Sequence, residues 1–164
     1  MTKFTLKEIA LAGLIAALYT VLGLAFLPIS IYIWQVRVAE ALTVLPFVTR
    51  AAIPGLFVGC LAVNAFGGMG WQDIVFGPLI TLVAAILTHR ASGISHRTTA
   101  VALAPLPPVL LNAFGVSLYL APILGMNYWF AVQMIALGQA VACYVLGIPL
   151  ILLLRNRIAS LVRR

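Results

Sequence analysis

Residues 128–154 read YWFAVQMIALGQAVACYVLGIPLILLL, a stretch that contains no Asp, Glu, Lys or Arg. A helix needs about 20 consecutive apolar residues to cross the ~30 Å hydrocarbon core of a bilayer, and this stretch is longer than that. The rest of the chain has the same character: 64% of its 164 residues are hydrophobic and 8% are charged, with a mean hydropathy of +1.17. Soluble domains are about 45–50% apolar and about 25% charged. The chain is therefore expected to be an integral membrane protein.

Five other apolar runs precede this one, separated by proline, glycine and polar residues. Together they predict an all-α fold, a single bundle of six transmembrane helices formed by residues 1–164. The second run rises only roughly 20 Å at 1.5 Å per residue, so we expect it to lie against protein or to line a cavity. The expected helices cover residues 5–27, 36–49, 52–66, 74–88, 99–120 and 128–154.

The basic residues predict the orientation of this bundle. Six crossings place both termini on one side, which also collects 9 of the 10 basic residues, whereas Arg37 falls on the other side. By the positive-inside rule, the basic side and both termini are cytoplasmic. The net charge of +7 then reflects topology and attraction to anionic lipid headgroups, and no nucleic-acid partner is expected. The nine residues are Lys3, Lys7, Arg50, Arg90, Arg97, Arg155, Arg157, Arg163 and Arg164.

The sequence offers little for catalysis or metal binding. Its only acids are Glu8, Glu40 and Asp73, and its two cysteines, Cys60 and Cys143, lie in apolar stretches without neighbouring ligands. It contains no glycine-rich phosphate loop, no Ser-His-Asp set and no metal-ligand cluster. We expect no catalytic residue, no metal and no cofactor.

Polar and aromatic side chains concentrate on the outer side of the predicted topology. Glu40 is the most informative of them, because a carboxylate inside a membrane segment is costly and usually faces a cavity or a partner. Arg37 shares its helical face, so the two residues could simply form a structural pair. The alternative is a polar, aromatic-walled cavity open to the outside, suited to a small, flat, hydrogen-bonding ligand. The other outer residues could equally form an aromatic belt with solvated loops; they include Trp34, Asn64, Trp71, Asp73, Asn112, Trp129 and Gln133.

Small residues recur at a spacing of four in the first predicted helix. Ala12 and Ala16 form one such pair, and Gly13 and Ala17 form another. Small residues at this spacing let a second helix approach closely. That helix could belong to a partner protein or to this bundle itself.

Three motifs make the sequence resemble the QueT family of substrate-binding S components of energy-coupling factor (ECF) transporters. They are QVRVAEALTVLP at residues 35–46, AIPGLFVGC at residues 52–60 followed by Asn64, and WQDIVFG at residues 71–77 followed by TL at residues 81–82. The resemblance is closest over roughly residues 5–90 and is mainly topological beyond them.

The resemblance implies uptake of a queuosine precursor, above all prequeuosine-1 (7-aminomethyl-7-deazaguanine), across a bacterial plasma membrane. In this group of transporters the S component binds the substrate, while a transmembrane T component and two ATPase subunits supply the energy. The S component topples in the membrane to carry its ligand inward. The T component is expected to dock on the small-residue face of the first helix, with Ala12 and Ala16 at the contact.

A deazaguanine suggests a role for each polar candidate. Glu40 could accept the adjacent ring N–H and exocyclic amine, and Asp73 could pair with the cationic aminomethyl group. Arg37 would hold Glu40 in place or donate to the ring carbonyl. The remaining candidates are Asn64, Asn112 or Gln133 for the ring edges and Trp34, Trp71 or Trp129 for stacking.

Two alternatives stay open at this point. The chain could be an S component for another vitamin, such as thiamin, riboflavin or biotin. It could also be an accessory membrane subunit without a transport substrate. A binding titration separates these possibilities.

Overall fold

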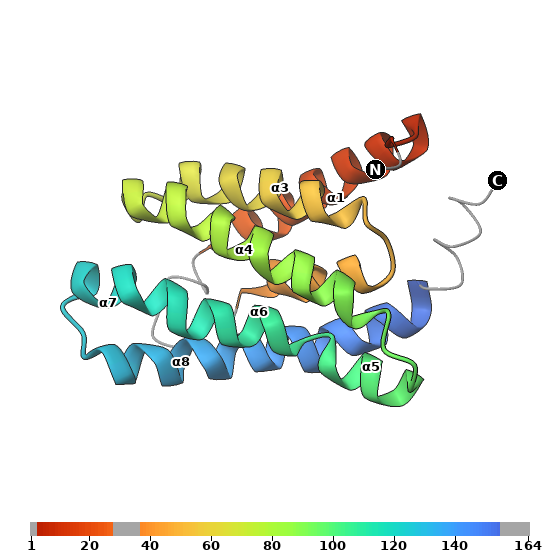
Figure 1. The fold of residues 1–164 in the computed structure, drawn as a ribbon. Coiled ribbons are helices and arrows are strands. Elements are labelled where there is room, and N and C mark those ends of the chain that lie inside the picture. Colours follow the sequence, from red (N-terminus) through yellow and green to blue (C-terminus); the bar gives the residue numbers. More distant parts are fainter. Residues whose placement is uncertain (1–2, 28–36, 155–164) are drawn as a thin grey trace.

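The computed structural model describes residues 3–27 and 37–154, and every regular element in these two stretches is a helix (Figure 1). The expectation of an all-α fold is therefore confirmed for the described residues. In chain order the elements are α1 (Leu6–Ala25), η1 (Val38–Phe47), α3 (Ala52–Gly67), α4 (Trp71–Ala91), α5 (Arg97–Leu103), α6 (Leu106–Leu111), η2 (Asn112–Val116), α7 (Ser117–Leu124), α8 (Tyr128–Ala140) and η3 (Val141–Gly147).

Four helical segments of the described chain are long and apolar enough to cross a membrane. Two of them are composite: α5, α6, the π-helical η2 and α7 form one segment, and α8 continues through the π-helical η3. Their outward faces are rich in exposed Leu, Ile, Val and Phe, as expected for surfaces in contact with lipid tails. The four segments are Leu6–Ala25, Trp71–Ala91, Arg97–Leu124 and Tyr128–Leu154.

The short element η1 lies inside the bundle. It is a 3-10 helix of 10 residues, and at about 2.0 Å per residue it spans only about 20 Å. Its consecutive residues Ala39 to Pro46 are all buried, and it contacts α1, α3, α4 and η3. The structure thus encloses this segment in protein, as its length led us to expect.

The turn between α3 and α4 is shorter than the sequence suggested. Gly68 ends α3 with a φ of 72°, and Gly70 precedes α4 with a φ of 104°. Glycine adopts this left-handed region at little cost, so the chain reverses within a few residues. As a result α4 starts at Trp71 instead of residue 74, and Asp73 belongs to its first turn and not to a loop.

Helices α1 and α3 pack unusually closely because α3 presents glycines to α1. A Cβ atom added at Gly55 would lie 2.6 Å from the carbonyl oxygen of Ala12. One added at Gly59 would lie 2.9 Å from Cβ of Tyr19 and 3.0 Å from the carbonyl oxygen of Ala16. Any larger residue at these two positions would push the helices apart.

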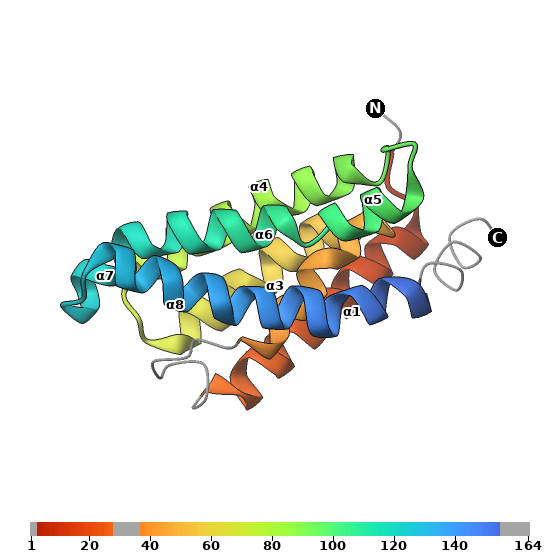
Figure 2. The ribbon, with the colours of Figure 1, turned by 90° about the horizontal axis from the view of Figure 1, so that it is seen from below.

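The described chain starts and ends at the same end of the bundle (Figure 1). At that end Glu8 of α1 accepts hydrogen bonds from Arg50, at 2.6 Å from Nε and 2.9 Å from Nη2, and ties α1 to the start of α3. The carboxylate raises the pKa of the Arg50 guanidinium, which therefore stays charged. His89 near the end of α4 bonds the carbonyl oxygen of Pro46 at 2.8 Å. Figure 2 shows α8 running alongside the α5–α7 segment, and η3 packs against η1.

Candidate functional site

We call the end of the bundle that contains Arg50 its basic end. Among the described residues, three charged side chains lie at the opposite end of the bundle. Arg37 immediately precedes η1, Glu40 lies in its first turn, and Asp73 lies in the first turn of α4. Both carboxylates are buried, with 2% of Glu40 and 6% of Asp73 exposed. One positive and two negative formal charges leave this end with a net charge of −1. Buried charges of this kind need partners, and the structure supplies them.

Glu40 is surrounded by hydrogen-bond donors from other helices. The hydroxyl of Tyr19 on α1 donates to Oε1 at 2.6 Å, and the amide of Asn112 on η2 donates to Oε2 at 3.3 Å. Nε of Arg37 lies 3.8 Å from Oε1. Both carboxylate oxygens are thus occupied within the protein.

The backbone of Glu40 is fixed as well. Its carbonyl oxygen accepts a hydrogen bond from Thr43 at 2.6 Å and from the thiol of Cys143 at 3.4 Å. Cys143 belongs to η3, so this contact joins η1 to the last described segment.

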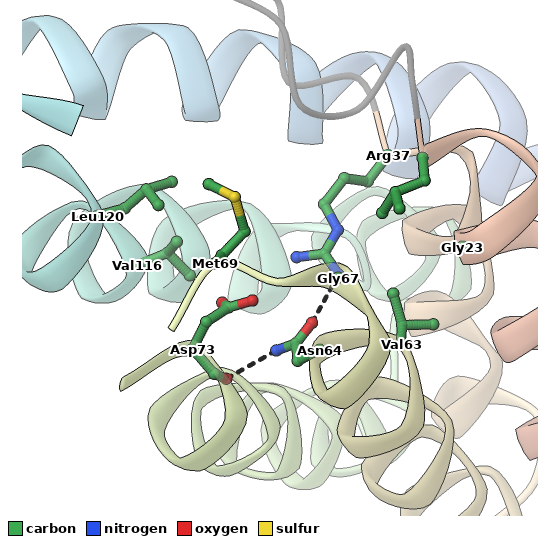
Figure 3. A pocket seen from close by; sticks show the side chains of 10 residues that line it. Gly23, Arg37, Val63, Asn64, Gly67, Met69, Asp73, Val116 and Leu120 are labelled. Carbon is green, nitrogen blue, oxygen red and sulfur yellow. Dashed lines mark hydrogen bonds between the residues drawn. The ribbon is translucent and has the colours of Figure 1, made fainter. Parts of the chain in front are cut away.

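Asn64 connects Arg37 to α4 (Figure 3). Its Oδ1 accepts a hydrogen bond from Nη2 of Arg37 at 3.1 Å, and its Nδ2 donates to the backbone carbonyl of Asp73 at 2.8 Å. Asn64 is 1% exposed. Its amide therefore uses both its acceptor and its donor to hold two neighbouring elements together.

The Asp73 side chain is oriented by a tyrosine from α7. The hydroxyl of Tyr119 donates to Oδ1 at 2.7 Å. The second oxygen, Oδ2, accepts no hydrogen bond from any other described residue. In Figure 3 the carboxylate points into the pocket, between Met69 and the guanidinium of Arg37.

These residues border a small pocket of about 40 Å³. Arg37, Asn64 and Asp73 form its polar edge, and apolar residues of α1 and the stretch just after it, α3, the α3–α4 turn, η2 and α7 form the rest of its wall. An acceptor group of a ligand could meet the guanidinium while a donor or a cation meets Asp73. The lining residues are Gly23, Leu27, Arg37, Val63, Asn64, Gly67, Met69, Asp73, Val116 and Leu120.

The other residues expected at the site are distributed differently. Asn112 is buried and reaches Glu40, but it does not line the pocket. Trp71 and Trp129 are 64% and 63% exposed, and Gln133 is exposed too. Trp71 stays linked to the site, because its ring packs on Phe76, whose ring packs on Tyr119. Trp34 lies outside the described residues.

Tyr19 and Tyr119 are site residues that the sequence analysis missed. Each lies in an apolar helix, where a tyrosine resembles any other large aromatic residue. A usable signal existed, because a buried tyrosine hydroxyl needs a hydrogen-bond partner and the membrane segments contain only a few acceptors. Which carboxylate each hydroxyl meets depends on how the helices pack, and a single sequence does not specify that.

The small residues of α1 fall on two faces. Ala12 and Ala16 face α3, where their carbonyl oxygens approach Gly55 and Gly59, and Ala16 is 9% exposed. Gly13 and Ala17 are exposed, and a Cβ atom added at Gly13 would meet nothing within 4 Å. One pair thus packs inside the bundle and the other faces outward.

No group of three or more His, Cys, Asp or Glu residues in the described parts of the chain is arranged to hold a metal ion. A family model described as QueT transporter matches residues 9–156 of the chain. Comparisons with curated proteins and with solved structures give no match.

Proposed function

Because the chain belongs to the QueT transporter family, we propose that it is the substrate-binding S component of an ECF transporter. Its substrate is a queuosine precursor, prequeuosine-1, which it binds from outside the cell. The membrane-spanning character of its helices and the transporter family support this role. Energy comes from separate subunits, a transmembrane T component and two ATPases.

The observation that carries the proposal is the charge of the buried cluster. The formal charges of Arg37, Glu40 and Asp73 sum to −1, and the other described side chains that contact them are uncharged. A ligand with a single positive charge neutralises this sum, and a buried site disfavours any uncompensated charge. Prequeuosine-1 carries one such charge on its aminomethyl group at neutral pH.

The pocket suggests how the ligand is oriented. Asp73 pairs with the aminomethyl group through Oδ2, while Oδ1 stays bonded to Tyr119. Arg37 donates to the carbonyl of the deazaguanine ring, since arginine has five N–H donors and Asn64 uses only part of them. Glu40 does not line the pocket; its contact with Arg37 keeps this guanidinium in place. Trp34, outside the described residues, stays a candidate for stacking on the base.

A bicyclic base requires the pocket to widen. Its volume of about 40 Å³ is far below the ~300–1,000 Å³ of ordinary ligand sites. Met69 is the side chain best suited to move, because it is half-buried at the pocket wall and methionine has three flexible torsions. We propose that its displacement, together with that of Leu27, admits the ligand.

The same proposal includes the topology and the partner surface. The chain crosses the bacterial plasma membrane six times, with η1 and α3 as the two short crossings and both termini in the cytoplasm. The basic end that contains Arg50 is then cytoplasmic, in agreement with the positive-inside rule. The T component docks on the exposed small-residue face of α1, formed by Gly13 and Ala17, because the Ala12–Ala16 face is occupied by α3.

Binding of ligands to the purified protein tests the function. Titration with prequeuosine-1, guanine and thiamin should give tight binding of prequeuosine-1, weaker binding of the neutral guanine, and none of thiamin. Tight binding of thiamin would identify an S component for another vitamin. An absence of binding to all three would contradict the proposal and leave an S component for riboflavin or biotin, or an accessory subunit.

A further inference from the structure

Gly77 lies one helical turn after Asp73 on α4, directly beneath the polar edge of the pocket. A Cβ atom added there would clash with Nδ2 of Asn64. It would also lie 3.4 Å from Oδ1 of Asp73 and 3.5 Å from the hydroxyl of Tyr119, which are ordinary contacts. The conflict is therefore specific to the Asn64 amide.

The Asn64 amide cannot move without breaking bonds. It is 1% exposed and donates to the Asp73 carbonyl while it accepts from Arg37. A shift large enough to admit a methyl group at position 77 would stretch or break at least one of these hydrogen bonds. Buried polar groups that lose a partner in this way carry a substantial penalty.

Arg37 depends on this amide for its orientation. Its guanidinium makes one hydrogen bond to Asn64, at 3.1 Å, and one longer ion pair with Glu40, at 3.8 Å. The Asn64 contact is the shorter of the two, so it sets the direction in which the remaining N–H groups point into the pocket.

We propose that Gly77 is a positioning residue of the pocket, because the missing side chain lets Asn64 hold Arg37 in the orientation that receives the ligand. The inference rests on the proposed function and deepens it. Gly77 affects the Arg37 edge of the pocket, which binds the ring carbonyl. Tyr119 affects the other edge through Asp73, which binds the cation. Gly77 and Tyr119 thus influence the binding of different parts of the ligand.

A double-mutant cycle tests this role. Gly77→Ala should weaken prequeuosine-1 binding by about tenfold or more, the size expected for a lost buried hydrogen bond. In an Asn64→Ala background the same change should alter the affinity less than about twofold, because the clashing amide is gone. Alanine also favours a helix more than glycine does, so a loss of affinity cannot come from local helix propensity.

Comparison of two ligands separates the Arg37 edge of the pocket from the Asp73 edge. Gly77→Ala should weaken guanine and prequeuosine-1 by similar factors, since both carry the ring carbonyl. Tyr119→Phe should weaken prequeuosine-1 while leaving guanine nearly unchanged. Gly93→Ala, in the turn after α4, is the matched control, because its Cβ atom would only contact the Arg90 carbonyl oxygen at 3.4 Å.

A thermal unfolding cycle without ligand keeps this inference separate from the proposed function. Gly77→Ala should lower the melting temperature in the wild-type background and leave it nearly unchanged in the Asn64→Ala background. If the wild-type protein binds no deazaguanine, the proposed function is wrong, and this cycle decides whether Gly77 positions Asn64. Additive effects in the unfolding cycle, or wild-type affinity in a Gly77→Ala protein that binds prequeuosine-1, would overturn the inference.

Discussion

The hydroxyl of Tyr19 lies 2.6 Å from Oε1 of Glu40, and this buried hydrogen bond joins α1 to η1. Both residues are enclosed, with 0% of Tyr19 and 2% of Glu40 exposed. Tyr119 makes the equivalent contact with Asp73, at 2.7 Å. Each buried carboxylate of the candidate site thus accepts a hydrogen bond from a tyrosine hydroxyl. Through Tyr19, the charged cluster is connected to the helix that carries Gly13 and Ala17 on its outer face.

Glu40→Gln tests whether the carboxylate acts through Arg37. The substitution keeps the size of the side chain but removes the ion pair, and the sum of formal charges at the site rises from −1 to 0. Arg37 is then left with Asp73 as its nearest carboxylate, in competition with the ligand. Hydrogen bonds with a charged partner contribute about 1.5–3 kcal/mol, so prequeuosine-1 affinity should fall roughly 10- to 100-fold. Guanine should also bind more weakly, as isothermal titration calorimetry can show.

Tyr19→Phe is the companion variant for Glu40→Gln. It keeps the ring in the core and leaves the charge of Glu40 intact, so its main effect should be a lower melting temperature and only a small change in affinity. A folded Glu40→Gln protein with wild-type affinity for both ligands would reduce the Arg37–Glu40 contact to a structural pair.

Asp73→Asn should separate the charged part of the ligand from its ring. The amide can still accept the hydrogen bond from Tyr119, so the local structure is expected to survive. The ion pair with the aminomethyl group is lost, and we expect prequeuosine-1 affinity to fall by about one to two orders of magnitude. Guanine binding should change little. Equal losses for both ligands would mean that Asp73 does not face the aminomethyl group.

Much of the helical architecture could be predicted because it depends on local patterns. Apolar runs between proline, glycine and polar residues predicted segments close to those observed. The first and last described helical segments, Leu6–Ala25 and Tyr128–Leu154, nearly coincide with the expected ranges 5–27 and 128–154. The shape of η1 and the π-helical turns of η2 and η3 were not foreseen. These depend on how buried segments fit each other, which a periodic pattern does not encode.

The site was predicted only in part, for a similar reason. Arg37, Asn64 and Asp73 were expected from polar residues at the outer end, and they do line one pocket. The exposure of Trp71 and Trp129 was not predicted, because a sequence does not distinguish an exposed tryptophan from one that stacks on a ligand. Glu40 contacts Arg37 but does not line the pocket. Its position depends on hydrogen bonds from α1 and η2, which are distant in the sequence.

The proposed topology is tested by labelling single cysteines in intact cells. The native Cys60 and Cys143 are 2% and 0% exposed, so they should contribute little background. A cysteine at Gly70 should react with an impermeant maleimide added outside, whereas one at Gly93 should react only after the membrane is permeabilised. Gly93 belongs to the turn between α4 and α5, and its labelling from outside would contradict the six-crossing arrangement.

The two faces of α1 allow the docking proposal to be tested with matched substitutions. Ala17→Leu places a larger side chain on the exposed face, where a partner helix would have to approach closely. Uptake of prequeuosine-1 by cells that contain the complete transporter should fall strongly, while its binding to the purified protein stays at the wild-type level.

Ala16→Leu enlarges the buried face that approaches Gly59. It should lower the melting temperature, because overpacking a close helix contact costs about 1–3 kcal/mol. Leu14→Ala, on the exposed surface of α1, controls for a change of apolar side-chain size on this helix and should leave the melting temperature nearly unchanged. If Ala17→Leu leaves uptake unaffected while Ala16→Leu blocks it in a protein of normal stability, the T component contacts the Ala12–Ala16 face and the packing of α1 on α3 must open during transport.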